Sequence, residues 1–452
     1  MHYNTGENPR LTMCDVNDEW TVVIDPDTMF WALISNKRDL QTTLRDEVIP
    51  RYLEVKDVLA EEMKKFRFEV FPTAVYFNAV DRCNADCLYC YIPKPLRSTG
   101  RKMSTEEIRT ALHRLQDYFS QFEMDGRKPV VVFHGSEPLL VKDSLKEVID
   151  EFDGVFHFGI QTNGTLLEQE DAEFIMERGV SIGLSLDSPD QKTNDHIRKL
   201  MGGGGTYEKV TRAIEWFDGY EGLNVVTTIT KYNVEHLPQM VDFLHERGVR
   251  AALMNPVRGT QPPAVQARPD IEKLTRFFIA AVERAVELTR SSGRPIVIGD
   301  YANLVLGIVA PLGRRLMCDI TPCGGGRRFF AISADGNIVP CGEFIGFEEF
   351  RGGNVLASQR DIERALDSEP FRKVRARVVE HIEHCSTCAF RNICGAPCPA
   401  EVYAVEGDMM HKSPYCEFFE HIIRHAFVLI ARGDAKYVIK EKDFDYKYKI
   451  MA

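Results

Sequence analysis

Three cysteines lie close together in the segment DRCNADCLYCY, which spans residues 81–91. Their spacing is C-x3-C-x2-C, and Tyr89 stands directly before the third cysteine. Three thiolates on one short loop can bind three irons of a 4Fe–4S cluster and leave the fourth iron open to a ligand. Zinc sites usually use two C-x2-C pairs, so zinc, or a buried core without metal, accounts less well for a single triplet. The spacing therefore predicts a catalytic iron–sulfur site at Cys83, Cys87 and Cys90.

The length and charge of the chain restrict the possible classes of protein. A chain of 452 residues is too long for one ordinary core and predicts two or three domains. The formal net charge of -11 disfavours non-specific binding to nucleic acid or to an anionic membrane. The sequence has no apolar run long enough to span a membrane, and its N-terminus lacks the pattern of a signal peptide. We therefore expect a cytoplasmic protein. Disulfides are rare there, so the twelve cysteines need another explanation.

Residues 1–70 are predicted to form a small N-terminal unit. Residues 20–24 and 29–34 are rich in apolar and β-branched residues and flank an Asp-Pro turn, which predicts a hairpin. Apolar residues then recur every three to four positions over residues 39–65, which predicts a helix. A hairpin and one helix are too small to fold alone, so we expect them to pack on the main domain. Cys14 is expected to be a bystander.

From residue 71 to about residue 300 the pattern alternates between strands and helices. The expected strands are residues 74–78, 130–134, 158–162, 182–186, 225–229 and 251–254. The expected helices between and after them include residues 104–119, 170–177, 207–216, 237–246 and 270–291, whereas residues 261–264 are expected to be irregular. Such alternation predicts an α/β fold with a parallel sheet and right-handed crossovers. Six strands are fewer than the eight of a complete (β/α)8 barrel.

Small and polar residues follow the expected strands at their C-terminal ends, where parallel α/β folds place their chemistry. The order of these residues, behind the three-cysteine segment, resembles that of the radical S-adenosylmethionine (SAM) enzymes. The resemblance implies a partial (β/α)6 TIM-like barrel, with SAM bound to the open iron through its amino and carboxylate groups. It also implies that Glu137 contacts the SAM ammonium and Arg198 the SAM carboxylate. The cofactor-binding residues implied in this way are Tyr89, Gly135, Ser136, Glu137, Thr162, Asn163, Ser185, Asp187 and Arg198.

A second group of cysteines lies in residues 301–430. Four of them form a C-x2-C-x5-C-x3-C run, and a predicted hairpin around residues 334–337 precedes it. Zinc is an alternative, but eight cysteines in an iron–sulfur protein favour two more clusters. The region resembles the SPASM extension of radical SAM enzymes. The resemblance implies one fully ligated cluster on Cys318, Cys323, Cys341 and Cys398, and a second on Cys385, Cys388, Cys394 and Cys416. Residues 431–452 form a charged and aromatic tail.

The resemblance also implies a class of reaction. SPASM enzymes mostly modify peptides, so we expect a maturase that takes a hydrogen atom from a ribosomally made precursor peptide and forms a thioether or carbon–carbon cross-link. Residues 1–70 could then bind a leader peptide, and a flavodoxin or ferredoxin would donate electrons. The cofactors would be SAM and three 4Fe–4S clusters.

Two other functions stay open. Anaerobic sulfatase maturases, which form formylglycine, carry an aspartate directly after the third cysteine of the extension. Here Gly342 follows Cys341, and Glu343 comes one position later as a candidate base. A non-catalytic iron–sulfur electron carrier is an alternative from another class, against which the complete set of SAM-binding segments argues.

Overall fold

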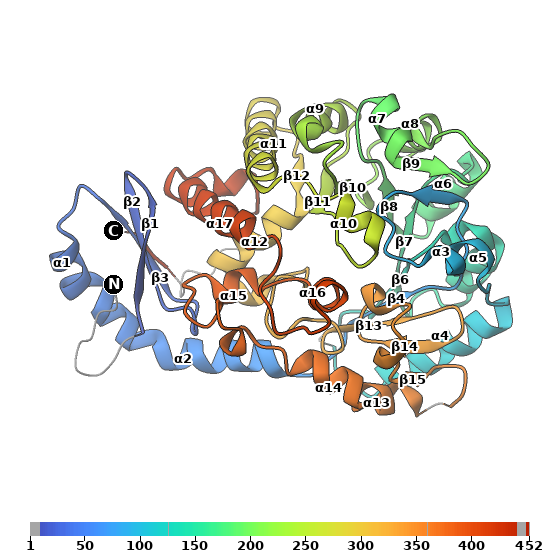
Figure 1. Ribbon diagram of the computed structural model, residues 1–452, viewed down its shortest axis with the longest axis horizontal. Helices are drawn as coiled ribbons and strands as arrows, with labels where there is room; N and C mark the ends of the chain where they lie inside the picture. Colours follow the sequence, from blue (N-terminus) through green and yellow to red (C-terminus); the bar gives the residue numbers. More distant parts are fainter. Residues whose placement is uncertain (1–9, 125, 359, 441–448, 452) are drawn as a thin grey trace.

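The computed structural model describes residues 10–124, 126–358, 360–440 and 449–451 (Figure 1). The predicted absence of a signal peptide concerns residues 1–9, which lie outside the described residues. Residues 441–448 and 452 of the predicted tail lie outside them as well. Within the described part of the chain, no helix is both long enough and apolar enough to cross a bilayer.

The predicted parallel sheet is confirmed. Its strands are β4 (Ala74–Phe77), β6 (Val130–Phe133), β7 (His157–Thr162), β8 (Ser181–Ser185), β10 (Leu223–Ile229), β11 (Ala251–Pro256) and the short β12 (Val297–Ile298). Each strand pairs in parallel with the next in this list, so the sheet runs in chain order from β4 to β12. All carboxyl ends therefore meet at one edge, as the sequence pattern predicts.

Helices connect these strands. They are α3 (Lys94–Thr99), α4 (Thr105–Phe119), α5 (Lys142–Glu151), α6 (Gln169–Glu177), α7 (Gln191–Ile197), α8 (Tyr207–Trp216), α9 (Leu237–Glu246), α10 (Pro262–Gln266), α11 (Ile271–Ser292) and α12 (Gly299–Val309). The five predicted helices (α4, α6, α8, α9 and α11) are confirmed. A capping box between Ser104 and Glu107 begins α4. The expectation of an irregular segment at residues 261–264 was wrong. Pro262 and Pro263 occupy the first turn of α10, where a helix needs no backbone donor.

The cysteine-rich region continues the same sheet. Strand β13 (Phe329–Ile332) pairs in parallel with β4, and β14 (Asn337–Val339) and β15 (Gly353–Asn354) follow in antiparallel order. The predicted hairpin is confirmed, and Gly336 supplies the positive φ of 84° that its turn requires. The pairing of β13 with β4 joins the second cysteine group to the first strand of the barrel. Helices α13 (Asp361–Leu366), α14 (Glu369–Arg375), α15 (Arg391–Cys394), α16 (Pro399–Glu406) and α17 (Cys416–Ala431) complete this region.

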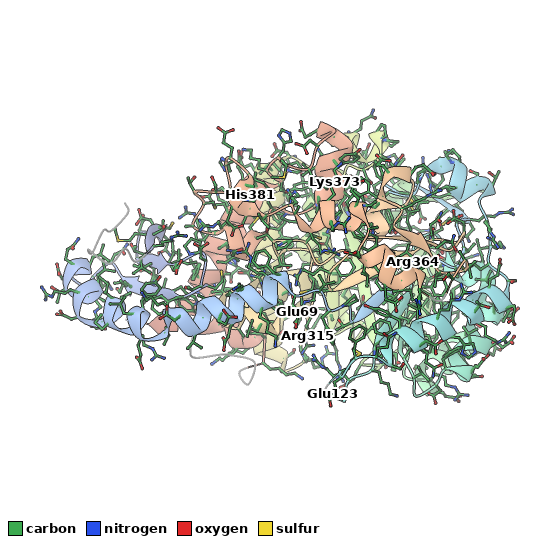
Figure 2. All side chains as sticks on the ribbon, turned by 90° about the horizontal axis from the view of Figure 1, so that it is seen from below. Glu69, Glu123, Arg315, Arg364, Lys373 and His381 are labelled. Carbon is green, nitrogen blue, oxygen red and sulfur yellow. The ribbon has the colours of Figure 1, made fainter. Side chains whose placement is uncertain are left out.

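The N-terminal unit contains the predicted hairpin and helix and one further strand. Strands β1 (Thr12–Asn17), β2 (Trp20–Ile24) and β3 (Trp31–Ser35) are antiparallel, and β16 (Lys449–Met451) adds to β3 in parallel. The sequence analysis missed β1 because Asp15 and Asn17 disfavour strands. Helical turns α1 (Leu40–Thr43) and η1 (Leu44–Val48) lead into α2 (Ile49–Phe68). Figure 2 shows α2 from below, running from this sheet toward Glu69 near the middle of the molecule.

The N-terminal unit packs on the rest of the chain, as expected, and several of its contacts reach the cysteine-rich region. The indole N–H of Trp31 donates to the carbonyl of Ile308 at 2.8 Å, and the Trp31 ring packs against Phe427 of α17. The Asn392 amide of α15 donates to the carbonyl of Pro26 at 2.8 Å. Ile308 lies in the last turn of α12, whose carbonyls have no intrahelical donor, so Trp31 satisfies a helix end.

We expect a Trp31→Phe substitution to lower the free energy of unfolding by about 1–3 kcal/mol. Phenylalanine keeps an aromatic ring in this fully buried place but leaves the carbonyl of Ile308 without its donor. Chemical denaturation of the full chain measures the change. Trp20→Phe, at a partly exposed indole, is the matched control and should be nearly neutral. Equal effects of the two substitutions would contradict the role given to the Trp31 hydrogen bond.

Candidate active site

The three-cysteine loop is held in place by short-range pairing. Within it, β5 (Ala85–Cys87) pairs antiparallel with β9 (Arg198–Leu200), which sets Cys87 opposite Arg198. Arg97 of α3 is buried and donates to the carbonyls of Ile92 at 3.0 Å and Ala85 at 3.3 Å. The loop is therefore fixed from both sides before any ligand binds.

A cavity of about 380 Å³ joins the two groups of cysteines. Its lining combines the loop, the ends of the parallel strands and part of the cysteine-rich region. Among the residues singled out from the sequence, the lining includes Cys83, Cys87, Tyr89, Cys90, Gly135, Ser136, Thr162, Asn163, Ser185, Arg198, Cys318, Cys323, Cys341, Glu343 and Cys398. Segments more than 200 residues apart in the sequence thus contribute to one internal space.

Arg198 is the cationic group nearest to the loop within this cavity. Its guanidinium forms an ion pair with Asp187 at 3.5 Å and donates to the Tyr89 hydroxyl, which itself donates to Asp187 at 2.8 Å. Asp187 is buried behind the lining, and burial raises its pKa while Arg198 opposes that rise. Arg198 Nε has no hydrogen-bond partner among the described residues. Asp187 and Tyr89 therefore orient Arg198, which keeps a donor for an anionic ligand.

Glu137 is fully buried and not part of the lining. Its carboxylate accepts from the Thr162 hydroxyl at 2.7 Å, the Asn163 N–H at 2.9 Å and the Leu139 N–H at 3.0 Å. These bonds fix the turn after β7, and the contact of Glu137 with the SAM ammonium stays a prediction. Gly135 lines the cavity. Its φ is 114°, which favours glycine, and a Cβ at this position would overlap the side chain of Asn78.

A Glu137→Gln substitution should weaken both the fold and SAM binding, with iron content unchanged. The new amide N–H2 would point at one of three donors, which costs about 1–3 kcal/mol in free energy of unfolding. Displacement of the Thr162–Asn163 turn should lower SAM affinity ~10-fold. Anaerobic equilibrium binding and denaturation measure the two effects. A loss of stability at unchanged SAM affinity would show that this turn does not contact SAM.

The second group of cysteines divides into the two predicted sets of four. Cys318, Cys323, Cys341 and Cys398 lie close enough to interact electrostatically and line the cavity. The other set, whose members interact with one another in the same way, does not line the cavity and consists of Cys385, Cys388, Cys394 and Cys416. One set therefore faces the candidate active site, and the other lies outside it.

The cysteines suit iron–sulfur clusters. All twelve are free thiols, and burial raises the pKa of Cys83 to about 12 and that of Cys90 to about 11, so these thiols stay protonated until a metal displaces the proton. Among the described residues, no three His, Cys, Asp or Glu side chains converge enough to hold a single metal ion. A four-iron cluster does not require this, because each cysteine binds a different iron.

Further polar residues of the cavity were missed in the sequence analysis. Arg258 follows β11 and lies 3.8 Å from Glu343 (Nε to Oε1), and burial raises the pKa of Glu343 to about 7. Asp300 of α12 accepts from the Met254 N–H at 2.7 Å, and burial raises its pKa to about 6. Arg258 could have been predicted, because it follows the C-terminal end of a predicted strand. Asp300 could not have been predicted, because β12 is too short to leave a periodic pattern.

Two family models match the chain. The radical SAM superfamily matches residues 77–244, and the SPASM iron–sulfur cluster-binding domain matches residues 323–389. The chain belongs to the radical SAM superfamily and carries a SPASM domain. SAM and iron–sulfur clusters are therefore the cofactors to which this radical SAM fold is suited.

Curated relatives align with most of this chain. An uncharacterized protein of Archaeoglobus fulgidus is 49% identical over 94% of this chain and 96% of its own length. Fe-coproporphyrin III synthase of Methanosarcina barkeri is 30% identical over 81% of this chain and 92% of its own length.

Solved structures share the fold. His-tagged anSMEcpe with bound AdoMet has a TM-score of 0.69 at 20% identity, covering 82% of this chain and 97% of the other. SuiB of Streptococcus suis bound to precursor peptide SuiA has a TM-score of 0.59 at 14% identity, covering 90% of this chain and 100% of the other. The predicted α/β fold with a partial barrel and a C-terminal SPASM domain is confirmed at the level of fold.

Proposed function

We propose that this radical SAM protein oxidatively modifies a ribosomally made peptide, taking a hydrogen atom from one residue and forming a thioether or carbon–carbon cross-link. The observation that carries the proposal is the single cavity between the three-cysteine loop and the inner SPASM cysteines. A substrate in this cavity would lie between the SAM-binding residues and an electron acceptor.

Three 4Fe–4S clusters fit the cysteine sets. We assign one to Cys83, Cys87 and Cys90, one to the inner set that lines the cavity, and one to the outer set. When bound, the first supplies the electron that cleaves SAM to methionine and a 5′-deoxyadenosyl radical, and the others supply an acceptor for the electron that the oxidised substrate gives up. An external flavodoxin or ferredoxin would donate the first electron in the cytoplasm.

The chain's own residues bind SAM and accept the proton. Arg198, oriented by Asp187 and Tyr89, would bind the SAM carboxylate through charge-assisted hydrogen bonds. Gly135, Ser136, Thr162, Asn163 and Ser185 would surround the remainder of SAM. Glu343 would accept the proton that the substrate loses, since a base with a pKa near 7 is suited to proton transfer at neutral pH.

The solved neighbours support a peptide substrate, because SuiB is seen with precursor peptide SuiA and anSMEcpe with AdoMet and the Cp18Cys peptide. In this proposal residues 1–70 bind a leader peptide, residues 71–300 form the barrel, residues 301–430 form the SPASM domain, and residues 431–452 form a tail. The placement of the N-terminal unit against α15 and α17 would bring a bound leader close to the outer cysteines.

Two measurements test the proposal. Anaerobically reconstituted protein with SAM and dithionite should release 5′-deoxyadenosine, which a non-catalytic electron carrier would not do. Co-expression with each small reading frame next to its gene should then yield one peptide that has lost hydrogens, located by tandem mass spectrometry. An unmodified set of peptides beside an active SAM cleavage would overturn the peptide assignment.

Two further candidates are separated by the same assay. Sulfatase maturation is less well supported, because Gly342 follows Cys341 where the sulfatase maturases carry an aspartate. Modification of a tetrapyrrole side chain is favoured by the 30% identity to Fe-coproporphyrin III synthase. A sulfatase-derived cysteine peptide, and a cell extract that supplies iron tetrapyrrole precursors, should each leave 5′-deoxyadenosine formation at its basal rate if the peptide proposal holds, and no Fe-coproporphyrin III should accumulate.

A further inference from the structure

Arg258 and Glu343 face each other across the junction between the barrel and the SPASM domain. Arg258 follows the C-terminal end of β11, and Glu343 lies in the short helix η5 (Gly342–Phe344) directly after Cys341. Both side chains line the cavity, and Arg258 Nε lies 3.8 Å from Glu343 Oε1. This distance is too long for a hydrogen bond, so each group keeps its bonding capacity.

The unused capacity can be located on specific atoms. Among the described residues, Glu343 Oε2 is shielded from solvent and has no hydrogen-bond partner. The Arg258 side chain is 24% exposed and makes the long ion pair to Glu343, and it also interacts electrostatically with Cys318, Cys398 and Glu401. One acceptor and several donors therefore point into the same part of the cavity.

A neighbouring ion pair gives a comparison at shorter distance. Glu401 is 1% exposed, and its Oε1 accepts from the Gly259 N–H at 2.7 Å and from Arg268 at 2.8 Å. That pair is joined by a direct hydrogen bond and lines a different cavity. The Arg258–Glu343 pair is open and lines the cavity, which is the arrangement expected of groups that wait for a ligand.

We propose that Arg258 and Glu343 together bind one extended residue of the substrate, with its backbone N–H donating to Glu343 Oε2 and its backbone C=O accepting from the Arg258 guanidinium. The inference deepens the proposed function and depends on it. An extended residue presents its own backbone N–H and C=O to the same side of the chain, so it offers one donor and one acceptor to the two open groups. An ammonium group would satisfy Glu343 alone and would be repelled by Arg258.

A substrate that carries several carboxylates fits the same place poorly. A carboxylate offers acceptors only, so it would leave Glu343 Oε2 unpaired and would face its charge. Asp300 and Asp319 line the cavity as well, and Asp319 is held there by the Asn303 amide at 2.9 Å and 3.0 Å. Arg258 interacts electrostatically with Glu343, Asp300 and Asp319, and Arg314 also interacts with Asp319.

The test uses anaerobically reconstituted full-length protein with SAM, and a pool of random pentapeptides that are acetylated and amidated at their ends. The readout is the dependence of 5′-deoxyadenosine formation on the pool concentration. Glu343→Leu should raise the half-saturating concentration ~10-fold or more, because it removes the acceptor, whereas Glu343→Gln keeps an acceptor oxygen and should change it much less. Arg258→Leu should act like Glu343→Leu. Glu348→Gln, on the exposed surface of the same segment, is the matched control.

A second probe gives a gain of binding. Fe-coproporphyrin III, followed by its Soret absorbance, should bind Glu343→Gln ~10-fold more tightly than wild type, because the substitution removes the carboxylate that repels it and leaves Arg258 to attract it. Iron content and melting temperature show whether each variant is folded and loaded.

The outcomes separate the two proposals. If the peptide pool stimulates the wild type and all Arg258 and Glu343 variants keep its half-saturating concentration, the backbone-binding role is wrong and the peptide function stands. If the pool has no effect and the wild type binds Fe-coproporphyrin III tightly with faster SAM cleavage, the peptide function is wrong. Stimulation with the predicted order of variants supports both.

Discussion

A Cys83→Ala/Cys87→Ala/Cys90→Ala variant should lose about four of the about twelve irons expected for three four-iron clusters, together with all cleavage of SAM. The three thiols lie on the loop fixed by Arg97 and by the β5–β9 pairing, and they share the cavity with Arg198. Without them no cluster can form beside the SAM-binding residues. Iron analysis and quantification of 5′-deoxyadenosine after dithionite reduction measure the two losses.

Cys14→Ala is the matched control for this experiment. Cys14 lies on β1, outside both cysteine groups, and the variant should keep the full iron content and SAM cleavage of the wild type. A triple variant that still produced 5′-deoxyadenosine would show that the open cluster is held elsewhere.

Arg198→Leu should lower SAM affinity ~10- to 100-fold, because it removes charge-assisted hydrogen bonds to the SAM carboxylate. It should also lower the free energy of unfolding by about 3–5 kcal/mol, because Asp187 is left buried and unpaired. Anaerobic titration with SAM and chemical denaturation separate the two quantities.

The double variant Arg198→Leu/Asp187→Asn distinguishes binding from folding. Neutralising Asp187 removes the unpaired charge, so much of the lost stability should return while SAM affinity stays low. If SAM affinity returned along with stability, Arg198 would act on the fold alone and the SAM carboxylate would need another partner.

The barrel could be predicted closely from the sequence because its pattern is local. The bounds of α8 and α9 agree with the prediction to the residue, since their apolar faces repeat every three to four positions between clear turns. Strand β1 was missed because its polar side chains are untypical of a strand, although it pairs with β2. The pairing of β13 with β4 joins residues about 250 apart, and no local pattern records it.

The candidate site was predicted to a similar extent for the same reason. Cysteine spacing and strand-end position are local, and they placed most of the named residues on one cavity. The position of Glu137 behind the lining depends on which neighbours its carboxylate finds, which the sequence does not state. The ion pair between Arg258 and Glu343 likewise forms only when the barrel and the SPASM domain pack together.

The shared sheet has a consequence for how the chain must be made and handled. β4 is bordered by β6 on one side and by β13 on the other, so a fragment ending near residue 300 would leave one whole side of β4 without its hydrogen-bonding neighbour. An uncovered, apolar strand edge is a template for self-association. The barrel is therefore expected to aggregate when produced alone, and protection of β4 from hydrogen exchange should appear only when residues around 330 have been synthesised and folded.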